Sequence, residues 1–386
     1  MNASLEMMLV KCAILLITLT VSFGSSGQVT FVIESLPDKH PEGDSIYIAG
    51  SFNGWNPADG DFLLQEGDQP YITLDGDAPI AFKFTRGSWA TVEGNATGEK
   101  IENRSYSFTG LPDTVIVSIA SWEDLSGTAN PVSSTRASNV TTIDQFEVPQ
   151  LNRFRRIWIY LPPDYTESDK RYPVIYMHDG QNVFDAATSF SGEWGVDEAL
   201  NELYEQEGFA AIVVAVDNGG DKRIDEYAPW SNTDYGGGEG VAYVDFLVKT
   251  LKPFVDDHYR TRPQAAHAAI VGSSLGGLIS YYAGMKYPEV FGRVGAPSPA
   301  FWFNPEIFDF TDTVALHPNT RLYLSAGGAE EASTATNMTR ITDQLVSRGF
   351  PKDQIHTAVH PDMQHNEAYW QSIVAEMVRW LMDNSN

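Results

Sequence analysis

One short segment combines a potential nucleophile with the glycines needed to expose it: Gly272-Ser-Ser-Leu-Gly276, between an apolar run and a helix-forming segment. A serine at such a strand-to-helix turn is typical of a nucleophile elbow, where its backbone is held in a cramped conformation. Glycine is needed two residues before and two after that serine, since larger side chains would collide with their neighbours. Ser274 meets this requirement, whereas Ser273 would have Val271 and Leu275 there. We therefore predict Ser274 as a nucleophile, with a non-catalytic serine-rich turn as the alternative.

A serine nucleophile needs a general base, and the best-placed histidine is His365. Reactive groups of an open α/β sheet gather at the carboxyl ends of its strands. His365 lies in the loop that follows the last predicted strand and precedes the last predicted helix, from which it can reach Ser274. Of the other histidines beyond the serine, His356 falls inside a strand and His317 in a polar connection, which leaves His360 as the competitor. A surface histidine that caps the final helix is the non-catalytic alternative.

The base in turn needs a carboxylate that holds its tautomer and stabilises the imidazolium. The predicted strand from Arg321 to Ser325 ends in Ala-Gly-Gly-Ala-Glu-Glu, which places Glu330 and Glu331 in the following loop. We predict that Glu330 has this role and keep Glu331 as the alternative. The resulting order of serine, acid and histidine along the chain is the order found in α/β-hydrolases.

Two backbone amides are predicted to stabilise the oxyanion of the transition state. The amide of Leu275 follows the nucleophile at a helix N-terminus, where free N–H groups and the helix dipole favour negative charge. The second is the amide of Gln181, since Gly180 lets the preceding loop turn inward. No metal ion or cofactor is expected, because the sequence has no His-Glu-x-x-His motif and the acidic residues near Asp217 lack the spacing of a calcium-binding loop.

These residues lie in the second part of the chain, 141–386, where apolar strands alternate with helical patterns. The predicted strands are Arg156–Leu161, Val174–Met177, Ala211–Val216, Ala268–Val271, Leu322–Ser325 and Ile355–Val359. The predicted helices are Asp197–Gln206, Tyr243–Tyr259, Leu275–Lys286 and Asn366–Met382. Such alternation predicts an α/β domain with a mostly parallel sheet covered on both faces, and the order of the catalytic residues predicts an α/β-hydrolase.

The preceding residues, 28–123, follow a different pattern. Short β-branched or aromatic runs alternate with Gly, Asp, Pro and Asn turns, which predicts an all-β, immunoglobulin-like sandwich. The runs are Val29–Ile33, Ser45–Ala49, Tyr71–Leu74, Ile80–Thr85 and Thr114–Ile119. Residues 124–140 are small and polar without periodicity, which predicts a linker between the two domains.

Residues 1–27 predict a secretory signal peptide. A lysine precedes an apolar run that is too short to span a bilayer, and small residues follow it. We expect cleavage near Gln28 and a secreted or periplasmic protein, with a retained anchor as the alternative. The formal charge of −26 would repel nucleic acid and anionic membranes and favour neutral substrates. We therefore expect no nucleic-acid partner and, after cleavage, no membrane attachment.

Five motifs stand in order within residues 141–383: Tyr176-Met-His-Asp-Gly-Gln-Asn182, Asp217-Asn-Gly-Gly with Arg223-Ile-Asp-Glu-Tyr-Ala-Pro-Trp230, Gly272-Ser-Ser-Leu-Gly276, Ser298-Pro-Ala-Phe-Trp302 and His365-Asn-Glu-Ala-Tyr-Trp370. Together they resemble the putative-esterase family, which includes esterase D, feruloyl and acetyl-xylan esterases of carbohydrate esterase family one, enterochelin esterases and mycolyltransferases. The resemblance implies that Ser274 is the nucleophile, His365 the base and Glu330 the acid, although some members work with a Ser/His dyad. It also implies that Arg223, Glu226, Tyr227 and Trp230 line the mouth of the substrate pocket or brace its loop, and that Trp302 lines the pocket.

Three N-terminal segments carry a second resemblance: Tyr47-Ile-Ala-Gly-Ser-Phe-Asn-Gly-Trp-Asn-Pro57, Phe82-Lys-Phe-Thr-Arg-Gly-Ser-Trp-Ala-Thr-Val-Glu93 and Glu102-Asn-Arg104. They are similar to starch-binding modules of carbohydrate-binding family twenty. The resemblance implies that Trp55 stacks on a sugar; the usual second tryptophan is absent, and Trp89 is its candidate replacement. An α-glucan or another polysaccharide is the expected partner. A sandwich that only packs against the hydrolase, with Trp55 in its core, is the alternative.

The sequence thus predicts a secreted serine esterase that acts through an acyl-enzyme on an acylated carbohydrate or a plant-derived acetyl or feruloyl ester. A carbohydrate-binding protein with an inert hydrolase domain is disfavoured because Ser274, His365 and the acidic loop are all present. An acyltransferase would use the same acyl-enzyme with a sugar hydroxyl in place of water. A siderophore esterase is disfavoured because an anionic ligand would meet a strongly acidic protein.

Overall fold

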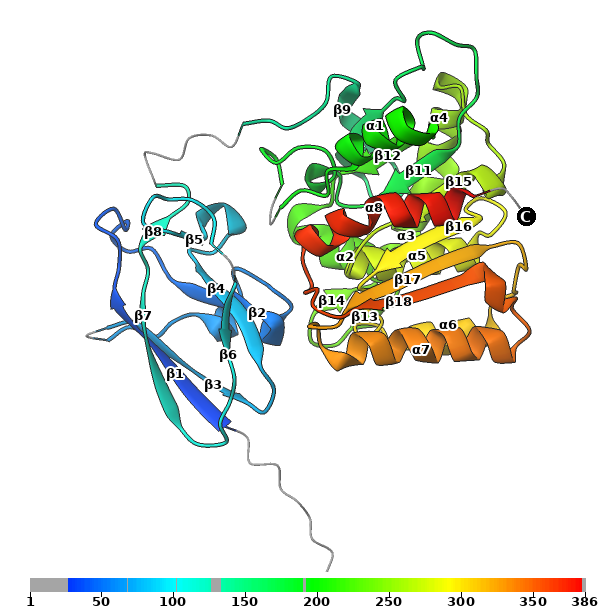
Figure 1. Cartoon of the computed structure of the whole chain (residues 1–386). Helices are drawn as coiled ribbons and strands as arrows, with labels where there is room; N and C mark the ends of the chain where they lie inside the picture. Colours follow the sequence, from blue (N-terminus) through cyan, green and yellow to red (C-terminus); the bar gives the residue numbers. More distant parts are fainter. Residues whose placement is uncertain (1–26, 68, 102, 126–132, 190–191, 384–386) are drawn as a thin grey trace, which may run out of the picture. The chain divides into compact units, whose positions relative to one another are not determined.

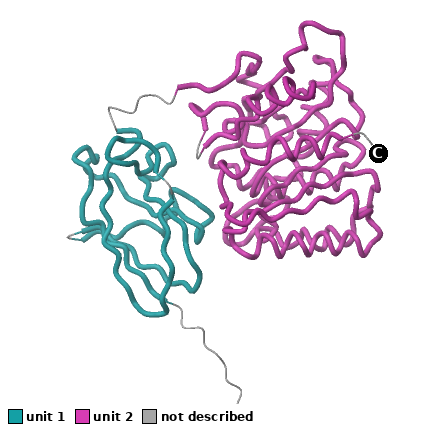
Figure 2. Tube along the Cα trace, in the orientation of Figure 1, with its two compact units in different colours: residues 1–129 teal, residues 130–386 magenta. Residues whose placement is uncertain are grey.

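The computed structural model describes residues 27–67, 69–101, 103–125, 133–189 and 192–383 (Figure 1). They belong to two compact units, residues 1–129 and residues 130–386 (Figure 2). Residues 1–26 of the predicted signal peptide lie outside the described residues, as do residues 126–132 of the predicted linker. No helix within the described residues is both long and apolar enough to cross a membrane.

The N-terminal unit consists of short strands in three small sheets (Figure 1). In the first sheet, β1 is antiparallel to β3 and parallel to β7; the second has the order β2-β4-β6, and β5 pairs with β8. The strands are β1 Gly27–Ser35, β2 Tyr47–Gly50, β3 Tyr71–Gly76, β4 Ile80–Thr85, β5 Glu93–Gly94, β6 Arg104–Tyr106, β7 Asp113–Ser118 and β8 Ser121–Trp122. The all-β prediction is confirmed, and the sequence missed only the very short strands β5, β6 and β8.

Aromatic side chains join the two three-stranded sheets of this unit. Phe31 of β1 lies 4.6 Å from Phe82 and 6.5 Å from Phe84, both in β4, measured between ring centroids. Val29, Phe31 and Ile33 are buried while the residues between them are not, because successive side chains of a strand point to opposite faces. The sheets therefore enclose one apolar core.

The second unit is organised around one sheet with the order β18-β17-β16-β15-β11-β12-β10-β9 (Figure 1). Strand β10 is antiparallel to β9 and β12, and all other neighbours are parallel. The strands are β9 Val140–Val148, β10 Arg153–Tyr160, β11 Val174–Met177, β12 Ile212–Val216, β15 Ala268–Val271, β16 Arg293–Pro297, β17 Arg321–Gly327 and β18 Ile355–His360. Every residue of β11, β12 and β15 is buried, as expected where helices cover both faces.

Helices cover this sheet on both faces, which confirms the α/β prediction. Tyr176 of β11 packs in an apolar cluster with residues of α3, α5, α6 and α7, whereas the adjacent Met177 packs in a second cluster with residues of α1 and α8. The helices are α1 Val196–Glu207, α2 Arg223–Tyr227, α3 Gly240–Phe246, α4 Lys252–His258, α5 Leu275–Lys286, α6 Glu306–Thr313, α7 Ala332–Ser347 and α8 Glu367–Met382. The single helix predicted at Tyr243–Tyr259 is instead α3 and α4, joined by a π-helical turn at Leu247–Leu251.

Strand β16 was not predicted from the sequence, although it lies between β15 and β17 near the centre of the sheet. Its residues, Arg-Val-Gly-Ala-Pro, include a glycine and a terminal proline, which are both depleted in strands. Hydrogen bonding to both neighbours overrides that weak local preference. The strand matters for the site, because the Pro297 carbonyl accepts a hydrogen bond from the Ser274 amide.

Candidate active site

Ser274 lies at the sharp turn between β15 and α5, at the carboxyl end of a central strand. Its backbone has φ 57° and ψ −122°, a conformation that residues with side chains rarely adopt. Its amide donates to the Pro297 carbonyl at 3.2 Å, and its carbonyl accepts from the Ala300 amide at 2.9 Å. These bonds hold the turn, with its strained serine, against the segment that follows β16.

The two glycines around Ser274 are required to different degrees. A Cβ atom at Gly272 would lie 2.7 Å from His178 Cδ2 and 2.9 Å from the carbonyl carbon of Gly276, which is closer than such atoms approach. A Cβ atom at Gly276 would have its nearest neighbours at 3.5 Å, an ordinary contact. The crowding expected at both positions therefore exists only at Gly272.

Glu330 and His365, predicted from separate loops, meet in the structure. His365 Nδ1 and Glu330 Oε2 are 3.0 Å apart, and the Glu330 side chain is 1% exposed. Glu330 Oε1 accepts from the Gly327 amide at 2.8 Å and from the Ser298 hydroxyl at 2.5 Å. Burial opposes ionisation, but the hydrogen bond and charge of His365, with the bonds from Ser298 and Gly327, hold the pKa of Glu330 below its usual value. An ionised Glu330 can only accept a hydrogen bond, so the proton of this bond is on His365 Nδ1, and in the neutral imidazole Nε2 has a free lone pair.

The alternatives that the sequence left open lie elsewhere. Glu331 is exposed at the N-cap of α7, where the Ser333 hydroxyl donates to it at 3.4 Å. His360, the last residue of β18, has its ring 5.3 Å from that of Tyr369. Of the two candidate acids, only Glu330 pairs with His365.

Ser298 connects the Ser274 turn to the Glu330–His365 pair, a position that the sequence did not predict. It is fully buried with φ 48°, it donates to Glu330, and it accepts from the Trp370 indole at 3.0 Å. The Trp370 ring also packs edge-on against His365, with centroids 5.2 Å apart. The Ser-Pro-Ala-Phe-Trp motif marks this segment in the sequence but does not reveal its partners. No hydrogen bond joins the Ser274 hydroxyl to His365 within the described residues; the connection runs through this segment.

The loop after β11 packs against the Ser274 turn, as the oxyanion prediction requires. Leu275 is the first residue of α5, and the first amides of a helix have no intrahelical acceptor. Gln181 lies in the short 3₁₀ turn Gly180–Asn182, preceded by Asp179 with φ 54°. A Cβ atom at Gly276 would lie 3.5 Å from Asp179 Oδ2, which shows how closely the loop approaches the turn.

An ion pair braces this loop. Arg223 Nε and Nη2 donate to the two Asp179 oxygens at 2.7 and 2.9 Å, and Asn218 donates to the same carboxylate at 2.7 Å. The guanidinium also lies over the Tyr227 ring, 5.1 Å from its centroid. Burial alone would raise the pKa of Asp179, but the charge and hydrogen bonds of Arg223 hold it below its usual value. Of the two roles that the sequence left open for Arg223, these contacts are those of a brace.

His178 precedes Asp179 in the same loop. Burial lowers the pKa of His178 to about 4, so this histidine is neutral.

The two tryptophans predicted at the pocket differ in exposure. Trp230 is partly buried and packs edge-on against Tyr282 and Phe310, with centroids 5.4 and 6.0 Å apart. Trp302 is 43% exposed and follows by two residues the Ala300 amide that bonds to the serine turn. Of Trp230 and Trp302, Trp302 therefore has the more accessible ring.

Residues 149–381 match the family described as Putative esterase, and this range includes Ser274, Glu330 and His365. The chain belongs to this esterase family. Its similarity to the uncharacterized protein YbbA of Bacillus subtilis (strain 168) is 28% identity over 245 residues, which cover 59% of this chain and 92% of that protein. The iron(III) enterobactin esterase of Dickeya dadantii (strain 3937) is 27% identical over 287 residues, which cover 66% of this esterase and 57% of the relative.

Solved structures with the same fold include two esterases. The enterobactin esterase from Shigella flexneri has a TM-score of 0.53 at 15% identity, with 87% of each chain covered. A ferulic acid esterase has a TM-score of 0.50 at 18% identity, covering 63% of this chain and 97% of its own. Identities this low show the fold alone. The N-terminal region is similar to a different protein, an α-amylase of Niallia circulans. The identity is 38% over 100 residues, which cover 25% of this esterase and 8% of the amylase.

Proposed function

We propose that this carboxylic ester hydrolase is an exported serine esterase that removes acyl groups from an acylated carbohydrate or a plant-derived ester through an acyl-enzyme. Ser274 is the nucleophile, His365 the general base and Glu330 the carboxylate that orients it, while the amides of Leu275 and Gln181 bind the oxyanion. The observation that carries the proposal is the 3.0 Å bond between Glu330 and His365, held beside the strained serine turn.

The arrangement supports a two-step reaction. His365 Nε2 takes the Ser274 hydroxyl proton as Oγ attacks the ester carbonyl, and the ionised Glu330 stabilises the imidazolium. The negative charge that develops on the carbonyl oxygen meets the two backbone N–H groups. The imidazolium then protonates the leaving alcohol, and water activated by the same histidine cleaves the acyl-enzyme. The proton transfer requires Ser274 Oγ and His365 Nε2 to lie about 2.6–3.2 Å apart. Catalytic hydrogen bonds of this kind often reach that length only when substrate is bound.

The acid can be tested by comparing two neighbouring glutamates. Glu330→Gln is expected to lower kcat about 10²–10⁴-fold, because an amide at this position favours the wrong tautomer of His365. Glu331→Gln is the matched control and should change kcat less than about twofold, since its exposed side chain does not contact His365. Steady-state hydrolysis of p-nitrophenyl acetate measures both. Greater sensitivity at Glu331 would place the acid one residue further along the chain.

A carbohydrate as part of the substrate is supported by the N-terminal unit. Trp55 and Trp89 lie with ring centroids 6.1 Å apart and planes inclined by 40°. Both side chains are partly exposed and lie outside the buried core of their unit. Two adjacent indoles suit the stacking of sugar rings, and the similarity to an α-amylase region points to an α-glucan. If each indole contributes about 1.5–3 kcal/mol before association costs, the expected Kd is about millimolar to tens of micromolar.

Removal of one indole should separate binding from turnover. Trp55→Ala is expected to weaken retention on insoluble starch at least about fivefold while leaving kcat for p-nitrophenyl acetate unchanged. Leu111→Ala is the matched control, because Leu111 is also a large exposed apolar residue of this unit. Sedimentation of the full-length protein with starch and with cellulose gives the measurement. If wild-type protein is retained on neither polysaccharide, the binding role is wrong.

A second candidate is the hydrolysis of a siderophore ester, which is what the names of several relatives describe. The brace formed by Arg223 argues against it, because a guanidinium paired in bidentate fashion with Asp179 offers little free positive charge to an anionic ligand. Parallel assays with acetylated and feruloylated xylo-oligosaccharides, methyl ferulate and enterobactin distinguish the two. A higher kcat/KM for enterobactin than for every carbohydrate ester would favour the siderophore.

A further inference from the structure

A compact group of carboxylates that the proposed mechanism does not use lies at the start of α1. Glu193 precedes the helix, and Asp197 and Glu198 are in its first turn. One potential ligand atom from each residue lies within 4.8 Å of the other two. None of the ion pairs formed between described residues includes any of the three.

Two oxygens of this group are buried and accept no hydrogen bond from the described residues: Asp197 Oδ1 and Glu193 Oε1. Asp197 has no exposed surface, and one of its oxygens lies within 4.8 Å of an oxygen of Glu198. A buried acceptor without a donor is costly, and two facing carboxylates need a proton or a cation between them.

The other oxygens of Asp197 and Glu193 hold the chain that leads into β9. Asp197 Oδ2 accepts from the Ala137 amide at 2.7 Å, and Glu193 Oε2 accepts from the Thr135 hydroxyl at 2.7 Å. Asp185 adds bonds from the Ser134 hydroxyl at 2.8 Å and the Thr135 amide at 3.3 Å. Residues 134–137, which the sequence predicts as part of the linker, therefore belong to the second unit and are held there by carboxylates near the start of α1.

We propose that Glu193, Asp197 and Glu198 bind a calcium ion that holds residues 134–137 against the start of α1. The ion satisfies Asp197 Oδ1 and Glu193 Oε1, while the other oxygen of each carboxylate accepts from Ala137 and Thr135. This replaces the expectation, drawn from the sequence motifs, that the chain has no metal site.

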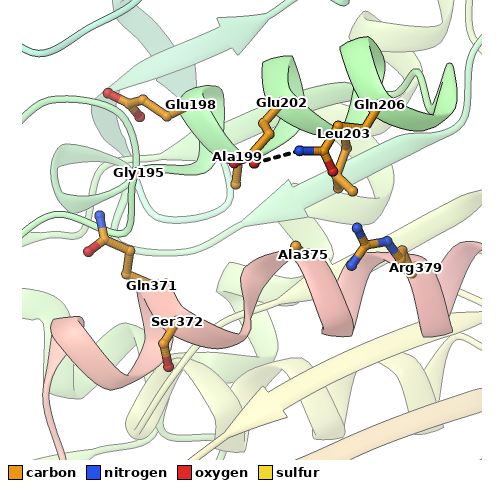
Figure 3. A pocket seen from close by; sticks show the side chains of 10 residues that line it. All are labelled: Gly195, Glu198, Ala199, Glu202, Leu203, Gln206, Gln371, Ser372, Ala375 and Arg379. Carbon is orange, nitrogen blue, oxygen red and sulfur yellow. Dashed lines mark hydrogen bonds between the residues drawn. The ribbon is translucent and has the colours of Figure 1, made fainter.

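The ligand set selects a hard divalent cation. All three ligands are carboxylates, which suit Ca²⁺ and Mg²⁺, and no histidine or cysteine is in the group to favour zinc. Calcium is the better fit, because it accepts irregular sets of six to eight oxygens at 2.3–2.6 Å, whereas Mg²⁺ demands near-ideal octahedral geometry. Glu198 is exposed at one end of a groove between α1 and α8 (Figure 3), so a hydrated ion can reach the group from solvent.

Titration calorimetry of the full-length protein, freed of metal by EDTA and dialysed, tests the binding step with CaCl₂ and MgCl₂. We expect one Ca²⁺ per chain with a Kd below about 1 mM, and binding of Mg²⁺ at least about tenfold weaker. Glu198→Gln should weaken Ca²⁺ binding at least about tenfold. Glu205→Gln is the matched control and should leave it unchanged, because Glu205 is an exposed glutamate of the same helix outside the group. Asp197→Asn should abolish binding, and if it fails to fold, Glu198→Gln alone carries the test.

Limited digestion with trypsin tests whether the ion holds residues 134–137 in place, because Arg136 lies within this segment and is exposed. We expect 2 mM CaCl₂ to slow cleavage after Arg136 at least about fivefold in the wild-type and Glu205→Gln proteins, relative to other sites in the same digest, and not in Glu198→Gln. Absence of saturable Ca²⁺ binding, or an equal loss in Glu205→Gln, would overturn the site. Equal affinity for Mg²⁺ would overturn the choice of calcium. Binding of Ca²⁺ that does not slow cleavage after Arg136 would overturn the proposal that the ion holds residues 134–137.

Discussion

Replacement of Ser274 by alanine is expected to lower kcat for ester hydrolysis by about 10⁶-fold, because it removes the oxygen that forms the acyl-enzyme. The backbone bonds of the turn to Pro297 and Ala300 do not involve that oxygen, so the fold should be retained. Hydrolysis of p-nitrophenyl acetate and the thermal unfolding temperature measure the two effects. Ser273→Ala is the matched control at the adjacent serine and should keep most of the activity. Turnover of a tenth of wild type in Ser274→Ala would rule out this nucleophile.

Replacement of His365 by alanine is expected to be nearly as damaging, with a loss in kcat of about 10⁴–10⁶-fold. The side chain supplies the only nitrogen that is both oriented by Glu330 and left with a free lone pair in our proposed site. His360→Ala is the matched control, since His360 follows the same strand and contacts Tyr369 instead. The same assay serves for both variants. A larger loss in His360→Ala than in His365→Ala would move the base to His360.

The two effects should not add. Removal of either member of a serine–histidine pair leaves the other without a function, so the double variant should be about as slow as the worse single variant. A double variant much slower than either single variant would mean that the two residues act independently, which the proposed reaction does not allow.

Local patterns were enough to predict the elements around the nucleophile. The predicted bounds of β11, β15 and α5 are those observed, because these segments are mostly apolar and the serine turn lies between the last two. Helix α7 was missed, although Thr334, Met338, Ile341 and Leu345 recur with helical spacing on its buried side. Its many threonines and serines lower helix propensity, and packing against β17 and β18 compensates.

The sequence by itself predicted the residues of our proposed site, which are a serine at a tight turn and a histidine and an acid after successive strands, and it determined a class of fold that brings strand ends together. These are consequences of short-range sterics and periodicity, which act within a few residues. Only the tertiary structure decided that Glu330 rather than Glu331 meets His365, that Ser298 and Trp370 contact the pair, and that Arg223 pairs with Asp179. It also decided that residues 134–137 are fastened at the carboxylates of α1. Such contacts join positions far apart in the chain, and their hydrogen bonds depend on burial and direction, which spacing along a sequence does not encode.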